Sequence, residues 1–160
     1  MELGPSRPEH RPALEAFLQD RNALRVARRG ELVDALEHPA VLAWSQGELT
    51  GAATYVVDGY GCELLTLHAA TRLRGVGTAL LSAVKDIARD AGCRRLWVVT
   101  TNDNVEALRF YQRRGFRLVL IRPGAVDRSR ETLKPEIPTL GDHDIPLRDE
   151  LELEMKLTLE

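Results

Sequence analysis

The chain has few cysteines, few aromatic residues and no long hydrophobic run among its 160 residues. Cys62 and Cys93 are too few for a disulfide framework and lack metal-ligand spacing, so we expect free thiols in a reducing compartment. No apolar segment approaches the roughly 20 residues that cross a bilayer. The opening stretch MELGPSRPEHRP lacks the apolar core of a signal peptide. These absences predict a cytoplasmic protein with no membrane partner.

An excess of one charge is also missing, since 22 Lys and Arg stand against 24 Asp and Glu. A duplex-binding domain is usually basic, so nucleic acid is not expected as a partner. The four histidines are scattered along the chain, which predicts no metal site. With 44% hydrophobic and 29% charged residues, the composition is that of a globular protein. The length suits a single domain over 1–160.

The periodicity of the apolar residues indicates an α/β (α+β) fold. Helical spacing or helix start and stop signals occur around 12–18, 30–36, 76–91 and 103–114. Short apolar runs or alternation predict strands at 41–46, 49–58, 62–70, 96–100, 116–121 and 151–157. The short connections between the first three strands predict antiparallel pairing, whereas the helix between 62–70 and 96–100 predicts a parallel pair. We therefore expect a mixed, mostly antiparallel twisted sheet flanked by helices.

The segment 122–150 is long for a connection inside a compact domain. It contains four prolines and a short stretch of helical character near 127–133. Long loops of this kind are either functional or disordered. We expect a partly ordered, lid-like loop.

The junction between strand 62–70 and helix 76–91 carries glycine at 75 and 77. The first N–H groups of a helix lack intrahelical partners and lie at the positive end of its dipole, and glycine allows a diphosphate to approach them closely. The P-loop lysine is absent, and Leu80 replaces the third glycine of the Rossmann pattern. The junction therefore predicts a pyrophosphate cradle made of Arg72, Arg74, Gly75, Val76, Gly77 and Thr78.

Two motifs in this part of the chain resemble those of the GNAT superfamily of N-acetyltransferases. Arg72-Leu-Arg-Gly75-Val-Gly77 matches the pattern Arg/Gln-x-x-Gly-x-Gly/Ala, and Asn104 to Phe116 resembles Asn-x-x-Ala-x-x-Phe-Tyr-x-x-x-Gly-Phe. The resemblance covers roughly 40–121, and 151–158 would supply the last strand. It implies a GNAT-like acyl-CoA N-acyltransferase fold with acetyl-CoA as the donor. The acceptor it implies is a primary amine on a small molecule or a peptide.

The resemblance also implies roles for residues around the donor. Backbone N–H groups near Leu67, His68 and Ala69 would polarise the thioester carbonyl. Asn104 would bind the pantetheine arm, for which Ala107 leaves room, although Asn104 also suits an ordinary helix start. Tyr111 would protonate the departing thiolate as a general acid. Its alternative role is that of a core aromatic residue.

The general base is less well defined. Glu63 begins strand 62–70 and is our candidate base, with a position at the rim of the site as the alternative. By strict alternation His68 lies on the opposite face of that strand, so the two side chains are not expected to share a site. An imidazole titrates in the useful range, but a single histidine is as readily a hydrogen-bonded bystander.

The sequence does not identify the acceptor substrate. One group of charged residues suits either an acidic acceptor or a solvated helix face, namely Arg21, Arg25, Arg28 and Arg29. Another lies at the end of the lid-like loop and suits a cationic acceptor, namely Asp144, Asp149 and Glu150. The predicted reaction is direct attack of the amine on the thioester in a ternary complex. A non-catalytic acyl-CoA sensor or interaction module is the alternative, and the long loop and last strand could support a homodimer.

Overall fold

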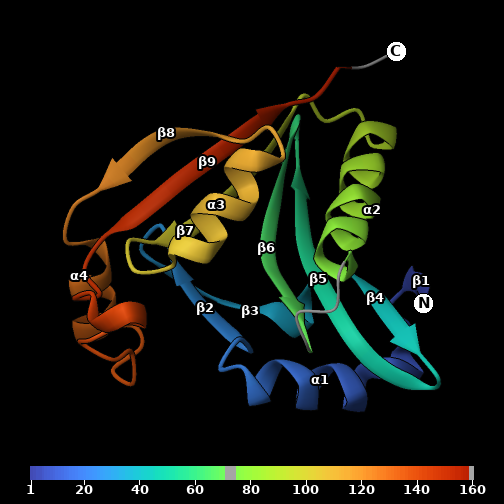
Figure 1. Cartoon of the computed structure of the whole chain (residues 1–160), viewed down its shortest axis with the longest axis horizontal. Helices are drawn as coiled ribbons and strands as arrows, with labels where there is room; N and C mark the ends of the chain where they lie inside the picture. Colours follow the sequence, from blue (N-terminus) through green and yellow to red (C-terminus); the bar gives the residue numbers. More distant parts are fainter. Residues whose placement is uncertain (71–74, 159–160) are drawn as a thin grey trace. The chain divides into compact units, whose positions relative to one another are not determined.

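The computed structural model describes residues 1–70 and 75–158, which fold as two compact units. The first unit comprises Met1–Arg25, Asp34–Leu96 and the chain end from Leu157, and the second comprises Val26–Val33 and Trp97–Lys156. Each unit combines strands with helices (Figure 1). The predicted α/β (α+β) class, with mostly antiparallel strands flanked by helices, is confirmed. The single domain over 1–160 stays a prediction.

The first unit is built on four antiparallel strands in the order β1-β4-β5-β6. The predicted strands and the first and third predicted helices are present, and β1 is an addition that the sequence pattern did not indicate. The elements are β1 (Glu2–Pro5), α1 (Arg11–Asp20), β4 (Ala40–Ser45), β5 (Glu48–Asp58), β6 (Gly61–Ala69) and α2 (Val76–Asp90). Short 3-10 helices occupy Pro8–His10 and Ala35–Glu37.

Helix α2 packs against β4, β5 and β6, and a glycine sets how closely it approaches. A Cβ placed on Gly51 of β5 would lie 2.7 Å from Val76 Cγ1 and 2.9 Å from Leu80 Cδ1. Any larger residue at this position would push the first turns of α2 away from the strand. Gly51 therefore fixes the beginning of α2 against the sheet.

Strand β6 has one extra residue relative to β5 at a single point of their pairing. Thr66 pairs with Thr54, whereas Leu64 pairs with Tyr55, so Leu65 is the extra residue of a β-bulge. Because directly paired residues share a face, the bulge reverses the alternation of β6 on either side of Leu65. The sequence pattern gave no sign of this reversal.

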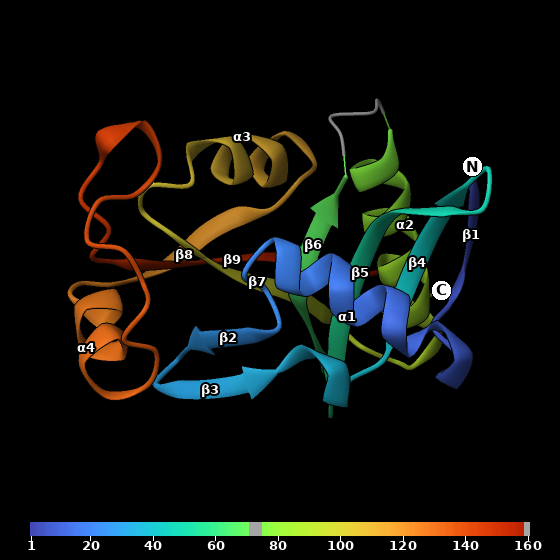
Figure 2. The same ribbon diagram turned by 90° about the horizontal axis from the view of Figure 1, so that it is seen from below.

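The second unit contains three strands in the order β7-β9-β8 and a separate pair, β2 and β3 (Figures 1 and 2). Strands β2, β3 and β7 each include one or two residues of the first unit. The elements are β2 (Arg25–Arg28), β3 (Glu31–Asp34), β7 (Arg95–Thr101), α3 (Val105–Arg113), β8 (Arg117–Arg122), α4 (Ala125–Thr132) and β9 (Glu150–Lys156). The predicted parallel pairing of 62–70 with 96–100 involves both units and stays a prediction.

The helix predicted around 30–36 is wrong, because this stretch belongs to a β-hairpin. Arg29 and Gly30 both have positive φ, at 55° and 78°, and form the two-residue turn between β2 and β3. Two positive φ angles in succession characterise the hairpin turn whose twist matches that of the strands. Arg25, Arg28 and Arg29 therefore lie on a hairpin and not on a solvated helix face, whereas Arg21 directly follows α1.

The predicted lid-like segment 122–150 is ordered by its own polar contacts. It contains α4, as predicted, and a 3-10 turn at Asp142–Asp144. The Arg130 guanidinium donates to the carbonyl oxygens of Ile137, Pro138 and Leu147 at 2.7–2.9 Å. Asn102 accepts from the N–H groups of Arg148 and Asp149 at 3.0 Å. Arg130 thus satisfies three main-chain carbonyl groups of the segment, and Asn102, which precedes the segment, binds its end.

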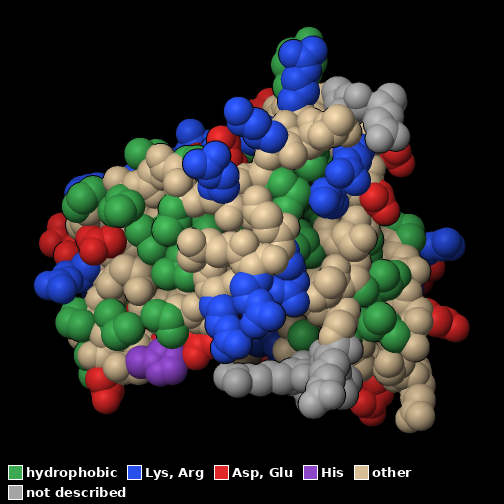
Figure 3. Space-filling view, turned by 45° about the horizontal axis from the view of Figure 1, so that its top comes forward, with side chains coloured by type: hydrophobic (Ala, Val, Ile, Leu, Met, Phe, Trp, Pro, Cys, Tyr) green, Lys and Arg blue, Asp and Glu red, His purple; other side chains and the backbone are tan. Residues whose placement is uncertain are grey.

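The near balance of charge is visible on the surface. On the face shown in Figure 3, basic and acidic side chains are interspersed with apolar ones. No helix within residues 1–70 and 75–158 has the length and apolarity needed to cross a membrane.

Candidate functional site

The beginning of α2 has the geometry expected of an anion-binding cradle. Gly75 precedes the helix with a φ of 91°, a conformation that side chains disfavour. The Ala79 N–H makes the first helical hydrogen bond, to the Gly75 carbonyl at 2.8 Å. The N–H groups of Val76 and Gly77 precede this bond and have no acceptor within the helix. The positive end of a 15-residue helix therefore coincides with donors that the helix itself does not use.

The structure brings most of the predicted cradle together in the first helical turn. Val76 is buried, Gly77 is half-buried and Thr78 is exposed. A Cβ on Gly75 would meet nothing within 4 Å, so the space beside the turn is open. Arg72 and Arg74 lie outside the described residues, and their predicted contribution is untested.

The end of β6 lies beside this turn, because Gly51 touches both. Ala69, His68 and Leu67 pair with Gly51, Ala52 and Ala53 of β5. A Cβ at Gly51 would lie 3.2 Å from the His68 carbonyl oxygen as well as 2.7 Å from Val76 Cγ1. The backbone predicted to polarise a carbonyl is therefore next to the predicted cradle within the first unit.

The bulge in β6 corrects the prediction that Glu63 and His68 lie on opposite faces. Glu63 pairs with Val56, and His68 pairs with Ala52, two even-numbered positions of β5 that share a face. The hydroxyl groups of Thr54 and Thr66 lie on the same face between them and are 2.6 Å apart. These residues form a polar row, here meaning Glu63, Thr54, Thr66 and His68.

The two titratable members of the polar row have different surroundings. Glu63 is only 3% exposed. Burial lowers the pKa of the His68 imidazole below its usual value, and the positive charge of Arg21 lowers it further. His68 is therefore neutral at pH 7 and able to accept a proton. Their pairing positions are four residues apart on β5, about 13 Å along a strand, so the two groups cannot bond to one another directly.

In the second unit, Asn104 is the cap of helix α3. Its side-chain oxygen accepts from the Ala107 N–H at 3.2 Å, which is the ordinary helix-start role. Asp103 and Glu106, although spaced as a capping box, do not cap this helix. The Asp103 carboxylate accepts from Thr101 Oγ1 at 2.5 Å and from the Asp142 N–H at 2.9 Å, while Glu106 pairs with His143.

Tyr111 is 6% exposed and lies among aromatic rings. Its ring centroid is 5.3 Å from that of Phe110, edge to face, and 5.2 Å from that of Phe116. Burial raises the pKa of its phenol above the ordinary value, so the hydroxyl keeps its proton at neutral pH. Tyr111 is thus packed in a core, and it also retains the proton that a general acid needs. Tyr111, Asn104 and Ala107 belong to the second unit, so their meeting with the cradle stays a prediction.

The three acidic residues at the end of segment 122–150 have different surroundings. Asp144 is exposed, and Asp149 accepts from the Gly124 N–H at 2.8 Å. Glu150 is almost fully buried and pairs with Arg122. Among residues 1–70 and 75–158, no three His, Cys, Asp or Glu side chains gather as a metal site would require.

The features that sequence reasoning missed depend on contacts between distant residues. Gly51 lies within an ordinary strand pattern, and only the approach of α2 shows its importance. Thr54 and Thr66 were not singled out, although threonine on a buried strand face is a signal of a polar pair. The extra residue in β6 leaves no mark in the local alternation.

Known proteins are similar to this chain in sequence and in fold. YdhI, an uncharacterized protein of Bacillus subtilis, is 45% identical over 105 residues, or 66% of this chain and 65% of YdhI. The chain thus matches slightly less than two thirds of that relative's length. An IAA acetyltransferase from Bacillus cereus superposes with a TM-score of 0.74 at 20% identity, covering 98% of this chain and 100% of its own.

A GNAT family acetyltransferase from Elizabethkingia anophelis with acetyl-CoA bound superposes with a TM-score of 0.69 at 20% identity, covering 98% and 97% of the two chains. These two superpositions establish the acyl-CoA N-acyltransferase fold predicted from the motifs. The model of the acetyltransferase (GNAT) family matches residues 5–116, well over half of the chain. The chain therefore belongs to the acetyltransferase (GNAT) family, a family of acyltransferase enzymes.

Proposed function

We propose that this protein is an N-acetyltransferase that transfers the acetyl group of acetyl-CoA to a primary amine. The observation that carries the proposal is the open, left-handed Gly75 at the start of α2, followed by N–H groups that have no acceptor within the helix and suit linked phosphates. Family membership and the acetyl-CoA bound to the Elizabethkingia relative support the same donor. The acceptor amine belongs to a small molecule or a peptide.

The donor fits the residues of the cradle. The diphosphate of coenzyme A would accept hydrogen bonds from the N–H groups of Val76, Gly77 and Thr78, and Arg72 and Arg74 would add positive charge. The pantetheine arm would pass along the end of β6, and Ala107 is the residue proposed to leave space for it. Because the side-chain oxygen of Asn104 is used in capping, its amide nitrogen is the group left to bind an amide carbonyl of the pantetheine arm.

Transfer would proceed by direct attack in a ternary complex. The nitrogen lone pair of the neutral amine forms a bond to the thioester carbon, whose oxygen accepts from backbone N–H groups near Leu67, His68 and Ala69. The carbon–sulfur bond then breaks, and the thiolate takes the proton of the Tyr111 hydroxyl. A base accepts the proton that the nitrogen loses. The products are the N-acetyl amine and coenzyme A.

Glu63 is the proposed base, and the polar row makes His68 the alternative. At pH 7 only about one alkyl amine in a thousand is neutral, so a base close to the amine matters. Both side chains lie on one face of β6, but about 13 Å separates their positions. One of them alone therefore takes the proton from a given amine.

The proposed reaction agrees with the location and the partners that the sequence predicts. Acetyl-CoA is an intracellular metabolite, so a donor site of this kind suits the cytoplasmic location predicted from the sequence. Neither nucleic acid, membrane nor metal has a role in the proposed reaction. A homodimer stays a prediction.

Replacing Gly75 by Ala is expected to weaken the binding of coenzyme A by roughly tenfold or more, because a Cβ disfavours the left-handed turn and occupies the phosphate side. Gly59→Ala is the matched control, since Gly59 also has a positive φ and open space around it but lies in the β5–β6 turn. Isothermal titration calorimetry with coenzyme A measures both. Equal affinities for the two variants would contradict the cradle.

Tyr111→Phe is expected to leave the affinity for coenzyme A nearly intact and to lower kcat about 100-fold, because it removes only the acidic proton. Tyr60→Phe, at an exposed tyrosine, is the control. Release of coenzyme A over a panel of amines is the measurement. Unchanged turnover in Tyr111→Phe would remove Tyr111 from the reaction. Binding of coenzyme A without turnover of any amine would favour a non-catalytic acyl-CoA sensor.

Arg21→Gln is expected to raise the pKa of His68, because it removes the positive charge that disfavours the imidazolium form. Burial is the larger cause and remains, so the pKa should stay below the usual histidine value. Arg21→Lys keeps the charge and serves as the control. The His68 ring signals, followed by NMR against pH, report the change, and a fall or no change would contradict it. The acidic limb of kcat/KM moves to higher pH in Arg21→Gln only if His68 is the base.

A further inference from the structure

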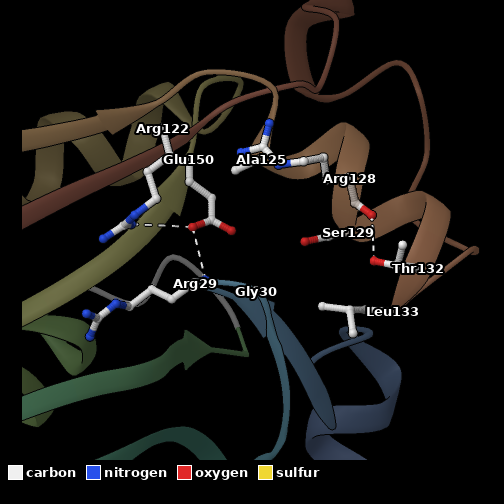
Figure 4. A pocket seen from close by; sticks show the side chains of 9 residues that line it. All are labelled: Arg29, Gly30, Arg122, Ala125, Arg128, Ser129, Thr132, Leu133 and Glu150. Atoms are coloured by element: carbon white, nitrogen blue, oxygen red, sulfur yellow. Dashed lines mark hydrogen bonds and ion pairs between the residues drawn. The ribbon is translucent and has the colours of Figure 1, made fainter.

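The second unit contains a pocket of about 350 Å³ that the proposed transfer does not use. It lies between the β2–β3 turn, the end of β8, helix α4 and the first residue of β9 (Figure 4). Segments far apart in the sequence thus contribute its walls. Its volume is within the range of small-molecule sites.

A buried carboxylate with one unused oxygen lies at the base of this pocket. Glu150 is 1% exposed. Its Oε1 accepts from the Arg29 N–H at 3.1 Å and from Arg122 Nη1 at 3.4 Å. Its Oε2 is buried and has no hydrogen-bond partner among the described residues. Buried polar atoms in folded proteins almost always have partners, so this oxygen marks a missing hydrogen-bond donor.

The unused oxygen faces helix α4. In Figure 4 the Oε2 atom points across the pocket toward Ser129, whose own hydroxyl is directed back toward Glu150. The Ser129 side chain is buried and lines the pocket. A hydroxyl can accept as well as donate. A group with several N–H donors, placed between the two side chains, would satisfy both.

The pocket also carries positive charge that its carboxylate does not balance. Arg122 bridges Glu150 and Glu152, with 2.7 Å to the latter. Arg29 lies over the Trp97 ring at 4.9 Å, and Arg128 donates to the Pro123 carbonyl at 3.2 Å. Neither Arg29 nor Arg128 pairs with a carboxylate among the described residues. A cation alone would meet the Arg128 guanidinium, and an anion alone would meet Glu150.

We propose that this pocket binds a small zwitterion of the α-amino acid class. The ammonium group donates to Glu150 Oε2 and Ser129 Oγ after a small adjustment of the buried carboxylate. The carboxylate of the ligand accepts from Arg128, whose guanidinium lies beside the same space (Figure 4). Ala125 and Leu133 supply an apolar wall for the ligand's side chain. The pocket uses no residue of the donor cradle, so the proposal does not depend on acetyl transfer.

Binding is tested without any acetyl donor. The twenty amino acids are screened at millimolar concentration by thermal shift, and the one that raises Tm most is titrated by calorimetry beside its N-acetyl derivative and its amide. The N-acetyl derivative lacks the ammonium group, and the amide lacks the carboxylate. Each is expected to bind roughly tenfold more weakly or worse, because each loses a charge-assisted interaction.

Two variants locate the site. Glu150→Gln keeps the shape of the side chain and an acceptor but replaces the free oxygen by a donor, and it should weaken binding by roughly tenfold or more. Ser129→Ala leaves the carboxylate contacts in place and should weaken binding a few-fold. Glu131→Gln, at an exposed position of α4, is the control and should bind as the unmodified chain does.

Three results would overturn the proposal. One is that no amino acid raises Tm, in which case water is the partner of Glu150 Oε2. Another is equal binding of the N-acetyl derivative. The third is unchanged affinity in both Glu150→Gln and Ser129→Ala. Should Glu150→Gln fail to fold, Ser129→Ala and the two derivatives decide the matter.

Discussion

The turn of the backbone at Gly75 is the constraint on which the account of this protein depends. Gly75 adopts a left-handed conformation directly before α2. The backbone N–H groups that follow it have no acceptor within the helix. Gly51 holds this turn against β5, since any side chain there would collide with Val76 and Leu80. Two glycines thus perform different tasks, one by its φ angle and the other by its size.

The β5–β6 pair serves two purposes because its faces differ. On one face, the residues that share the side of Gly51 pack against α2 and set the cradle. The other face carries the polar row and, at its end, the imidazole whose charge Arg21 influences. The single extra residue of β6 decides which side chains belong to each face. Without the bulge, regular alternation would place Glu63 and His68 on opposite faces, which illustrates how strongly the site depends on register.

Much of this could be predicted from sequence, because the signals are local and periodic. The apolar stripe of α2, the strands around the glycine turns and the glycine junction all follow from repeats of a few residues. The helix expected around 30–36 failed because Arg29, which is not a glycine, adopts a positive φ in the hairpin turn. The prediction that Glu63 and His68 lie on opposite faces failed because the sequence pattern does not reveal the bulge between them. Gly51, Arg130 and the unpaired oxygen of Glu150 acquire meaning only from residues distant in the sequence.

The most direct test of the cradle is the response of individual backbone amides to the diphosphate of the donor. Amide resonances of Val76 and Gly77 are followed by NMR while coenzyme A is added, and again with pantetheine, which has the same thiol arm without the diphosphate. The account predicts large shifts of both amides with coenzyme A and only small ones with pantetheine. Equal shifts with the two ligands, or resonances that do not move with coenzyme A, would contradict it.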